Sequence, residues 1–136
     1  MKNLTLKCHC DGVQLNLYLP NGFEEIRRCN CSICRRKGAV VSSALKENLK
    51  VITGHELLSK YQFNTKTAKH YFCPRCGIYT HHQRRSNPKI FGFNKEYIDQ
   101  FDLSSYENIP VLDGKNNHPS DDWKNKIFLL FDSCYQ

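Results

Sequence analysis

The sequence predicts a mainly β fold with little helix, and three observations support this. Apolar residues alternate with polar ones over residues 13–19, the period expected of a strand with one buried face. Several other short runs rich in β-branched and aromatic residues lie between turn-forming Gly, Pro and Asn residues. No window shows a sustained helical period, so long amphipathic helices are not expected.

The elements are expected in the following order. Residues 8–10 end a first strand, because Asp11-Gly12 favours a tight hairpin turn. The strand over residues 13–19 follows, and Pro20-Asn21-Gly22 closes it with a second turn. The remaining expected strands cover residues 26–29, 39–44, 49–52, 58–63, 69–72, 78–82 and 90–93. Helical signals are confined to the short stretches 32–36 and 97–101.

The chain is interpreted as a single domain, residues 1–136, because it shows no repeat and no linker-like composition. Residues 113–122 are rich in Asn, Asp, Gly and Pro and predict a loop. The apolar stretch 123–131 after it predicts a tail that packs on the sheet. The mean hydropathy of -0.60 is low for a globular domain, so metal sites would add useful stability.

No targeting or membrane segment is evident. Residues 1–10 lack the apolar stretch of a secretory signal, and the longest apolar run, residues 127–131, is far shorter than the roughly 20 residues of a membrane span. We therefore expect a cytoplasmic protein with no membrane partner. In a reducing compartment cysteines bind metal more readily than they form disulfides.

The net charge of +7 favours anionic partners, which range from nucleic acids to small carboxylates. Much of the positive charge is local. Basic residues flank one cysteine cluster at Arg27, Arg28, Arg35, Arg36 and Lys37, and Arg84 and Arg85 follow a histidine pair. Charge alone does not choose between these partner classes.

Seven of the eight cysteines fall into three clusters, and Cys134 lies outside them. The clusters are Cys8-x-Cys10, Cys29-x-Cys31-x-x-Cys34 and Cys73-x-x-Cys76. Zinc takes four ligands at tetrahedral angles, with sulfur about 2.3 Å from the metal, and two thiolates in one tight turn reach it together. Two distant pairs, Cys8/Cys10 and Cys73/Cys76, would therefore close a structural zinc site.

The remaining triplet supplies three thiolates from one short segment. Cys29, Cys31 and Cys34 would leave the fourth position of a zinc ion for an exchangeable ligand, which is the pattern of a catalytic site. Three thiolates reduce the Lewis acidity of the metal, so it would acidify a bound water only weakly. An incoming thiol therefore suits this position better than water does. The basic residues Arg28, Arg35, Arg36 and Lys37 would offset the negative charge.

Other assignments of the cysteines remain open at this stage. Disulfides are one, and a single ribbon-type zinc on Cys31/Cys34 and Cys73/Cys76 is another. Iron–sulfur ligation is a third, although the usual ferredoxin spacings are absent. A fourth ligand could also close the triplet into a second structural site, and the candidates are His70, His81, His82 and Cys134.

Several segments in order carry a family resemblance: Cys8-His9-Cys10, Cys29-Asn30-Cys31-Ser32-Ile33-Cys34-Arg35-Arg36-Lys37-Gly38, Thr53-Gly54, Tyr61-Gln62-Phe63, and His70-Tyr71-Phe72-Cys73-Pro74-Arg75-Cys76-Gly77. Over about residues 5–105 the chain resembles the glutathione-dependent formaldehyde-activating enzyme family. The resemblance implies a β-rich Mss4-like fold and two zinc ions per chain. It places a structural zinc on Cys8, Cys10, Cys73 and Cys76, and a catalytic zinc on Cys29, Cys31 and Cys34.

The activity implied by the resemblance is addition of the glutathione thiol to formaldehyde, classed as a carbon–sulfur lyase for the reverse reaction. Our leading hypothesis is a zinc-dependent lyase or thiol-adduct synthase acting on a glutathione-like thiol and a small aldehyde. Arg35 and Arg36 are candidate substrate anchors, with Arg84 and Arg85 as further candidates. The alternative is a zinc-stabilised binding module for nucleic acid or an acidic protein, in which Tyr71, Tyr79 and Phe91 either stack bases or lie in the core.

Overall fold

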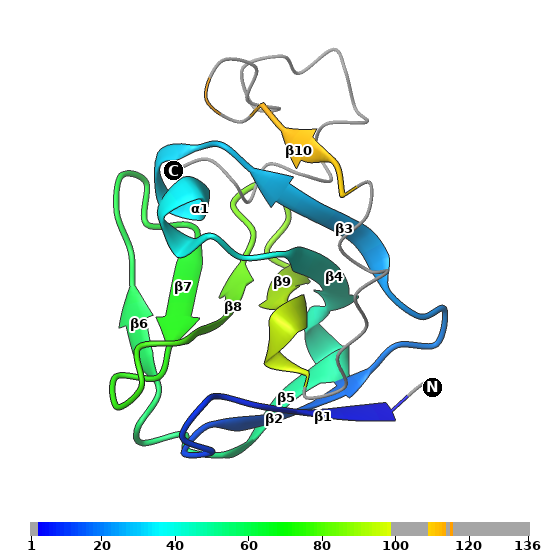
Figure 1. Cartoon of the computed structure of the whole chain (residues 1–136), viewed down its shortest axis with the longest axis vertical. Helices are drawn as coiled ribbons and strands as arrows, with labels where there is room; N and C mark the ends of the chain where they lie inside the picture. Colours follow the sequence, from blue (N-terminus) through cyan, green and yellow to red (C-terminus); the bar gives the residue numbers. More distant parts are fainter. Residues whose placement is uncertain (1–2, 99–108, 114, 116–136) are drawn as a thin grey trace.

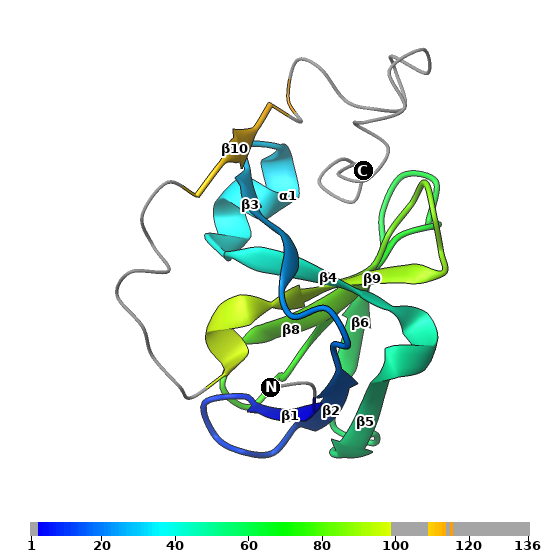
Figure 2. The ribbon, with the colours of Figure 1, turned by 90° about the vertical axis from the view of Figure 1, so that its right-hand side faces the viewer.

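The computed structural model describes residues 3–98, 109–113 and 115, and it shows two β-sheets. The smaller sheet has the order β1-β2-β5 and contains β1 (Asn3–Lys7), β2 (Gln14–Tyr18) and β5 (Leu49–Thr53). It crosses one end of the molecule, while α1 and β10 lie at the opposite end (Figures 1 and 2).

The larger sheet has the order β10-β3-β4-β9-β8-β7-β6. Its strands are β3 (Glu24–Cys29), β4 (Val41–Leu45), β6 (Ser59–Tyr61), β7 (Lys69–Phe72), β8 (Tyr79–Gln83), β9 (Ile90–Asn94) and β10 (Val111–Leu112). All of these pairings are antiparallel except that of β10 with β3, which is parallel. The prediction of a mainly β fold with little helix is confirmed.

The alternation along β2 sets one face of the core. Leu15 and Leu17 are buried while Asn16 and Tyr18 are exposed, as the two-residue period predicted. The core between the sheets also contains Leu6, Val13, Leu49, Phe91, Phe93 and Tyr97. Cys8 and Cys73 belong to the same cluster, so one candidate metal site lies within the main core.

The helix α1 (Ser32–Lys37) is short, because a capping residue ends it on each side. Cys31 is its N-cap, and the Cys31 Sγ accepts from the Cys34 backbone N–H at 3.5 Å. Gly38 ends the helix in the left-handed conformation with φ 65°, and its N–H donates to the Cys34 carbonyl. One helical turn therefore holds Cys31 and Cys34 together.

Some predicted boundaries differ from the structure. The strand expected over residues 58–63 is shorter, because a turn with positive φ at Asn64 and Lys66 follows β6. Residues 99–101 of the helical turn expected at 97–101 lie outside the described residues; the 3-10 helix η2 (Lys95–Tyr97) precedes them, and the Asn94 side chain caps its Glu96 N–H. The second described 3-10 helix, η1, is Lys46–Asn48.

The expected tail at 123–131 and Cys134 lie outside the described residues. Within the part of the chain that is described, no helix has the length and apolar character needed to cross a membrane.

Candidate metal centres

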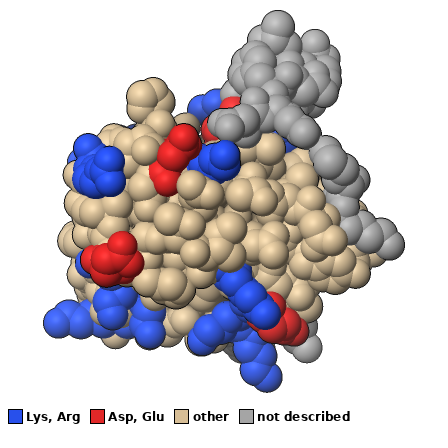
Figure 3. All heavy atoms as spheres, turned by 90° about the horizontal axis from the view of Figure 1, so that it is seen from below, with Lys and Arg blue, Asp and Glu red and all other residues tan. Residues whose placement is uncertain are grey.

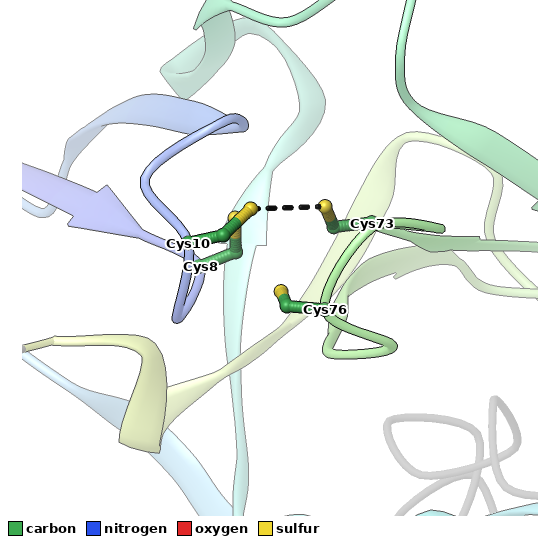
Figure 4. Close-up of side chains that lie close together, drawn as sticks. All are labelled: Cys8, Cys10, Cys73 and Cys76. Atoms are coloured by element: carbon green, nitrogen blue, oxygen red, sulfur yellow. Dashed lines mark hydrogen bonds between the residues drawn. The ribbon is translucent and has the colours of Figure 1, made fainter.

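The first candidate centre joins two tight turns from different sheets (Figure 4). Cys8 and Cys10 lie in the turn after β1, and Cys73 and Cys76 lie in the turn after β7. Backbone hydrogen bonds close both turns, from the Asp11 N–H to the Cys8 carbonyl at 3.0 Å and from the Gly77 N–H to the Cys73 carbonyl at 2.7 Å.

The sulfur geometry of this centre fits a tetrahedral metal. The four Sγ atoms lie within 4.8 Å of one another, with Cys8 to Cys10 at 3.6 Å and Cys10 to Cys73 at 3.7 Å. Four sulfurs around a zinc ion at about 2.3 Å would be about 3.8 Å apart. A disulfide would bring two of them to about 2.05 Å, and the seven described cysteines form no disulfide with one another. The disulfide alternative does not match this geometry.

The shifted pKa values of these thiols also favour a bound cation. Burial raises the pKa of the Cys8 thiol to about 12, despite a hydrogen bond from the Val13 N–H. Although burial acts in the same direction on Cys76, backbone hydrogen bonds from Cys10 and Ile78 lower its pKa to about 6. The Cys8 thiol therefore stays protonated at neutral pH unless a positive charge nearby compensates its ionisation. A divalent metal ion would supply that charge.

The second candidate centre is the triplet. Cys29 ends β3, and Cys31 and Cys34 lie at the start of α1, with their three Sγ atoms within 4.8 Å of one another. All three side chains are buried, and Ile33 and Leu112 pack against them. β10 holds this corner in place, because the Asn30 N–H donates to the Leu112 carbonyl at 3.1 Å.

In the described part of the chain, no fourth His, Cys, Asp or Glu ligand atom joins the triplet within this distance. His70 and His81 make other contacts: the His70 Nδ1 lies 2.8 Å from the Lys37 Nζ, and the His81 Nδ1 lies 2.9 Å from the Thr80 Oγ1. His82 comes nearer, because it lines a small pocket together with Cys29 and Cys34. The single-ribbon alternative does not match this grouping either, because Cys73 and Cys76 lie with Cys8 and Cys10.

Two cationic side chains line the small pocket beside the triplet. Arg27 is buried, and its Nη1 donates to the Glu25 carbonyl at 2.8 Å and to the Ser43 Oγ at 3.1 Å. Lys37 reaches the pocket from the last turn of α1. The buried sulfurs of the triplet therefore lie in a pocket that two cationic side chains also line.

A wider groove lies on the other side of Lys37. It has a volume of about 390 Å³, within the range of small-molecule sites. Its lining is largely aromatic and comes from α1, β6, β7 and β8: Ile33, Arg36, Lys37, Tyr61, His70, Tyr71, Phe72, Gly77 and Tyr79. The groove can hold an organic molecule of peptide size beside the triplet.

Comparison with known proteins agrees with this architecture. The sequence profile described as glutathione-dependent formaldehyde-activating enzyme matches residues 3–109. The chain belongs to this family. A crystal structure of a Rhodobacter sphaeroides protein is also similar, with 46% sequence identity and a TM-score of 0.75. The similarity covers 80% of this chain and 100% of that one.

The formaldehyde-activating family match includes both cysteine groups, and it extends slightly beyond the residues 5–105 expected from the motifs. The four arginines named as candidate anchors are placed differently. Arg35 and Arg36 are both exposed, and of the two only Arg36 lines the groove. Arg84 is buried and pairs with the Glu25 carboxylate at 3.3 Å, and Arg85 is half-buried. Their roles toward substrate stay predictions.

The aromatic residues considered for base stacking are divided between core and groove. Phe91 is buried in the core, while Tyr71 and Tyr79 line the groove. Figure 3 shows Lys and Arg mainly at the edges of the face seen from below, with Asp and Glu close to several of them. That face has a wide uncharged region between them and presents no continuous basic surface.

The sequence placed Arg27 among the basic residues that flank the triplet but did not assign it to the site, and it did not reveal the groove. The spacing of Arg27 from Cys29 could have indicated its position. Residues two apart on a strand share a face, and Arg27 and Cys29 are both buried on β3. The groove had no such signal, because its walls come from segments that are distant in the sequence.

Proposed function

We propose that this protein is a zinc-dependent carbon–sulfur lyase that adds the thiol of glutathione, or of a similar thiol, to formaldehyde or another small aldehyde, and that also catalyses the reverse reaction. The observation that carries the proposal is the triplet of Cys29, Cys31 and Cys34, which gathers three sulfurs within 4.8 Å with no fourth described ligand. Membership of the formaldehyde-activating family supports it.

In this proposal the triplet holds a catalytic zinc and the four-cysteine centre holds a structural one. Zinc bound by three thiolates would lower the pKa of an entering thiol and keep it in the thiolate form. The reaction then breaks the S–H bond and forms a C–S bond to the aldehyde carbon. The carbonyl oxygen gains the proton, which gives a hydroxymethyl thioether.

The charges around the triplet favour a thiolate as the fourth ligand. Zinc with three thiolates carries one net negative charge, and an incoming thiolate adds a second. Arg27 and Lys37 line the pocket with Cys29 and Cys34 and supply two positive charges. The site is therefore close to neutral when the thiolate is bound, which lowers the cost of burying it.

The groove would hold the body of the thiol. Arg36 offers a guanidinium to a substrate carboxylate, and Tyr71 and Tyr79 offer apolar surface to the peptide chain. Because these aromatic side chains replace water around the ligand, electrostatic contacts made there would be stronger than in bulk solvent.

The experiment is an exchange assay. Purified protein is mixed with glutathione and formaldehyde, and exchange between the free thiol and its hydroxymethyl adduct is followed by NMR. We expect exchange faster than the uncatalysed rate, with the acceleration lost in Cys31→Ser. Exchange at the uncatalysed rate, with two zinc ions bound per chain, would reject this substrate pair.

A further inference from the structure

Lys37 occupies the junction between the two cavities of the site. Of the described residues, it alone lines both the small pocket beside Cys29 and Cys34 and the aromatic groove. A ligand that contacts both cavities would therefore lie against this side chain.

Two neighbours fix the position of this ammonium. The Lys37 Nζ lies 2.8 Å from the His70 Nδ1, and it lies 3.9 Å from the centroid of the Tyr79 ring. The ring face attracts the cation, and the imidazole accepts one of its three N–H groups. His70 is suited to accepting, because burial and the Lys37 charge lower its pKa to about 3 and keep the ring neutral.

Other polar groups near the triplet are less suited to contact a reacting oxygen. The Arg27 guanidinium donates from Nη1 to the Glu25 carbonyl and the Ser43 Oγ, which hold it in the wall. His82 is neutral, because burial and nearby cations keep its pKa well below the usual value, and its Nδ1 pairs with the Tyr79 hydroxyl. Arg36 lines the groove only.

We propose that Lys37 is a catalytic residue that binds the aldehyde oxygen, because its ammonium is held by His70 and Tyr79 and its side chain lines both the groove and the pocket beside the cysteine triplet. The inference rests on the proposed function. As the thiolate sulfur forms a bond to the carbonyl carbon, the π electrons of the carbonyl move to oxygen, and the Lys37 ammonium stabilises that negative oxygen and gives it a proton. The entering thiol releases its proton to solvent, and the Lys37 amine takes up a proton from solvent after the addition, so the overall reaction is addition of the thiol to the aldehyde.

In the reverse direction, the Lys37 amine accepts the hydroxyl proton as the C–S bond breaks. This role differs from that of a substrate anchor in a measurable way. A group that acts only as charge develops on oxygen changes kcat, whereas a group that binds the substrate carboxylate changes KM.

The test compares Lys37→Met and Lys37→Arg with wild type in the NMR exchange assay, with zinc content and thermal unfolding measured on the same samples. Lys60→Met is the matched control, because Lys60 is exposed on β6 and lines neither cavity. We expect Lys37→Met to lower kcat by about 10²-fold with little change in the KM for formaldehyde, as for loss of one oxyanion donor. Lys37→Arg keeps the charge but displaces the donor, so a loss of about tenfold is expected, and Lys60→Met behaves as wild type.

Each outcome bears on a different claim. If the wild type is active and Lys37→Met has the same kcat, the role of Lys37 is overturned and the proposed function still stands. A rise in KM with unchanged kcat would also overturn it, because Lys37 would then be an anchor. An inactive wild type with both zinc ions bound would overturn the proposed function together with this inference. If Lys37→Met fails to fold, the Arg variant decides: unchanged kcat contradicts the proposal and the expected loss supports it.

Discussion

The Cys10 and Cys73 sulfurs lie 3.7 Å apart, although 63 residues separate them in the chain. Cys10 follows the first strand of the small sheet, and Cys73 follows β7 of the large sheet. A metal ion at this point would therefore connect the two sheets across the core that they share. Its binding free energy would contribute directly to folding.

Cys73→Ser should remove the structural ion and destabilise the fold. A structural zinc site contributes on the order of 10 kcal/mol or more in small zinc domains, so losing one buried ligand should cost at least about 3 kcal/mol. For a domain of this size that is a fall of about 10 °C in the midpoint of thermal unfolding. Calorimetry with zinc analysis of the same sample checks both quantities.

Cys134→Ser is the matched control, because Cys134 lies outside the three cysteine clusters. It should keep both zinc ions and the wild-type midpoint. Loss of one ion from this variant would mean that Cys134 completes the triplet, and an unchanged midpoint in Cys73→Ser would contradict the structural role of the first centre.

Arg36 and Arg35 should respond differently to truncation. Arg36 lines the groove and Arg35 does not, although they are neighbours on α1. Arg36→Ala should raise the KM for glutathione by about tenfold, because a charge-assisted hydrogen bond is lost, with little change in kcat. Arg35→Ala should leave both constants near wild type. Steady-state kinetics of the two variants test this prediction. An equal change in the KM for glutathione in both variants would argue against the groove as the thiol site.

Gly92→Ala should force His82 out of its position. Gly92 lies opposite His82 in the β8–β9 pair, and a Cβ at Gly92 would lie 2.8 Å from the His82 Nε2 and 3.0 Å from the Val41 Cγ1. Overpacking of this kind costs about 1–3 kcal/mol. His82 and Val41 also line the pocket beside the triplet, so the exchange rate should fall as well. Denaturant unfolding and the NMR assay test this prediction. A variant with the wild-type free energy of unfolding and exchange rate would show that His82 and Val41 can move aside at little cost.

Acid should destabilise the protein through its buried histidines. Burial, with a smaller effect of Lys37, lowers the pKa of His81 to about 3, while an unfolded histidine titrates near about 6.5. The folded state therefore binds fewer protons. The stability linked to His81 is fully present above about pH 6.5 and is lost as the pH falls toward about 3.

His81→Gln should reduce the slope of unfolding free energy against pH by about 1.4 kcal/mol per pH unit between about pH 6 and pH 4. His55→Gln is the control, because His55 is exposed, and it should keep the wild-type slope. Any effect of acid on the metal sites is common to both variants and cancels in the comparison. Equal slopes for the two variants would contradict the buried neutral state of His81.

The sequence predicted the strands and the cysteine grouping well, because both depend on short spacings. The alternation of Leu15 and Leu17 with polar residues identified a buried face, and the pairs of cysteines in short turns indicated which sulfurs lie together in the candidate metal centres. Boundaries were less accurate where a positive φ ended a strand, as at Asn64 after β6. No local pattern marks such a residue reliably.

The surroundings of the triplet depend on contacts between distant segments. Lys37 meets His70 across 33 residues, and the groove requires α1 to lie beside β7 and β8. The sequence showed a run of basic residues after Cys34 but not which of them faces a cavity, because a helix of six residues has too short a pattern to define an inner face.

The central claim is that the triplet holds a metal ion with one position open to a thiolate. The most direct measurement replaces zinc with cobalt(II) and follows the thiolate-to-cobalt charge-transfer absorption as glutathione is added under anaerobic conditions. The wild-type absorption should rise and saturate at one equivalent of glutathione per chain, S-methylglutathione should give no rise, and Cys31→Ser should lose the response. An absorption that glutathione leaves unchanged in wild type carrying two cobalt ions would show that the triplet is already closed, and would contradict the account.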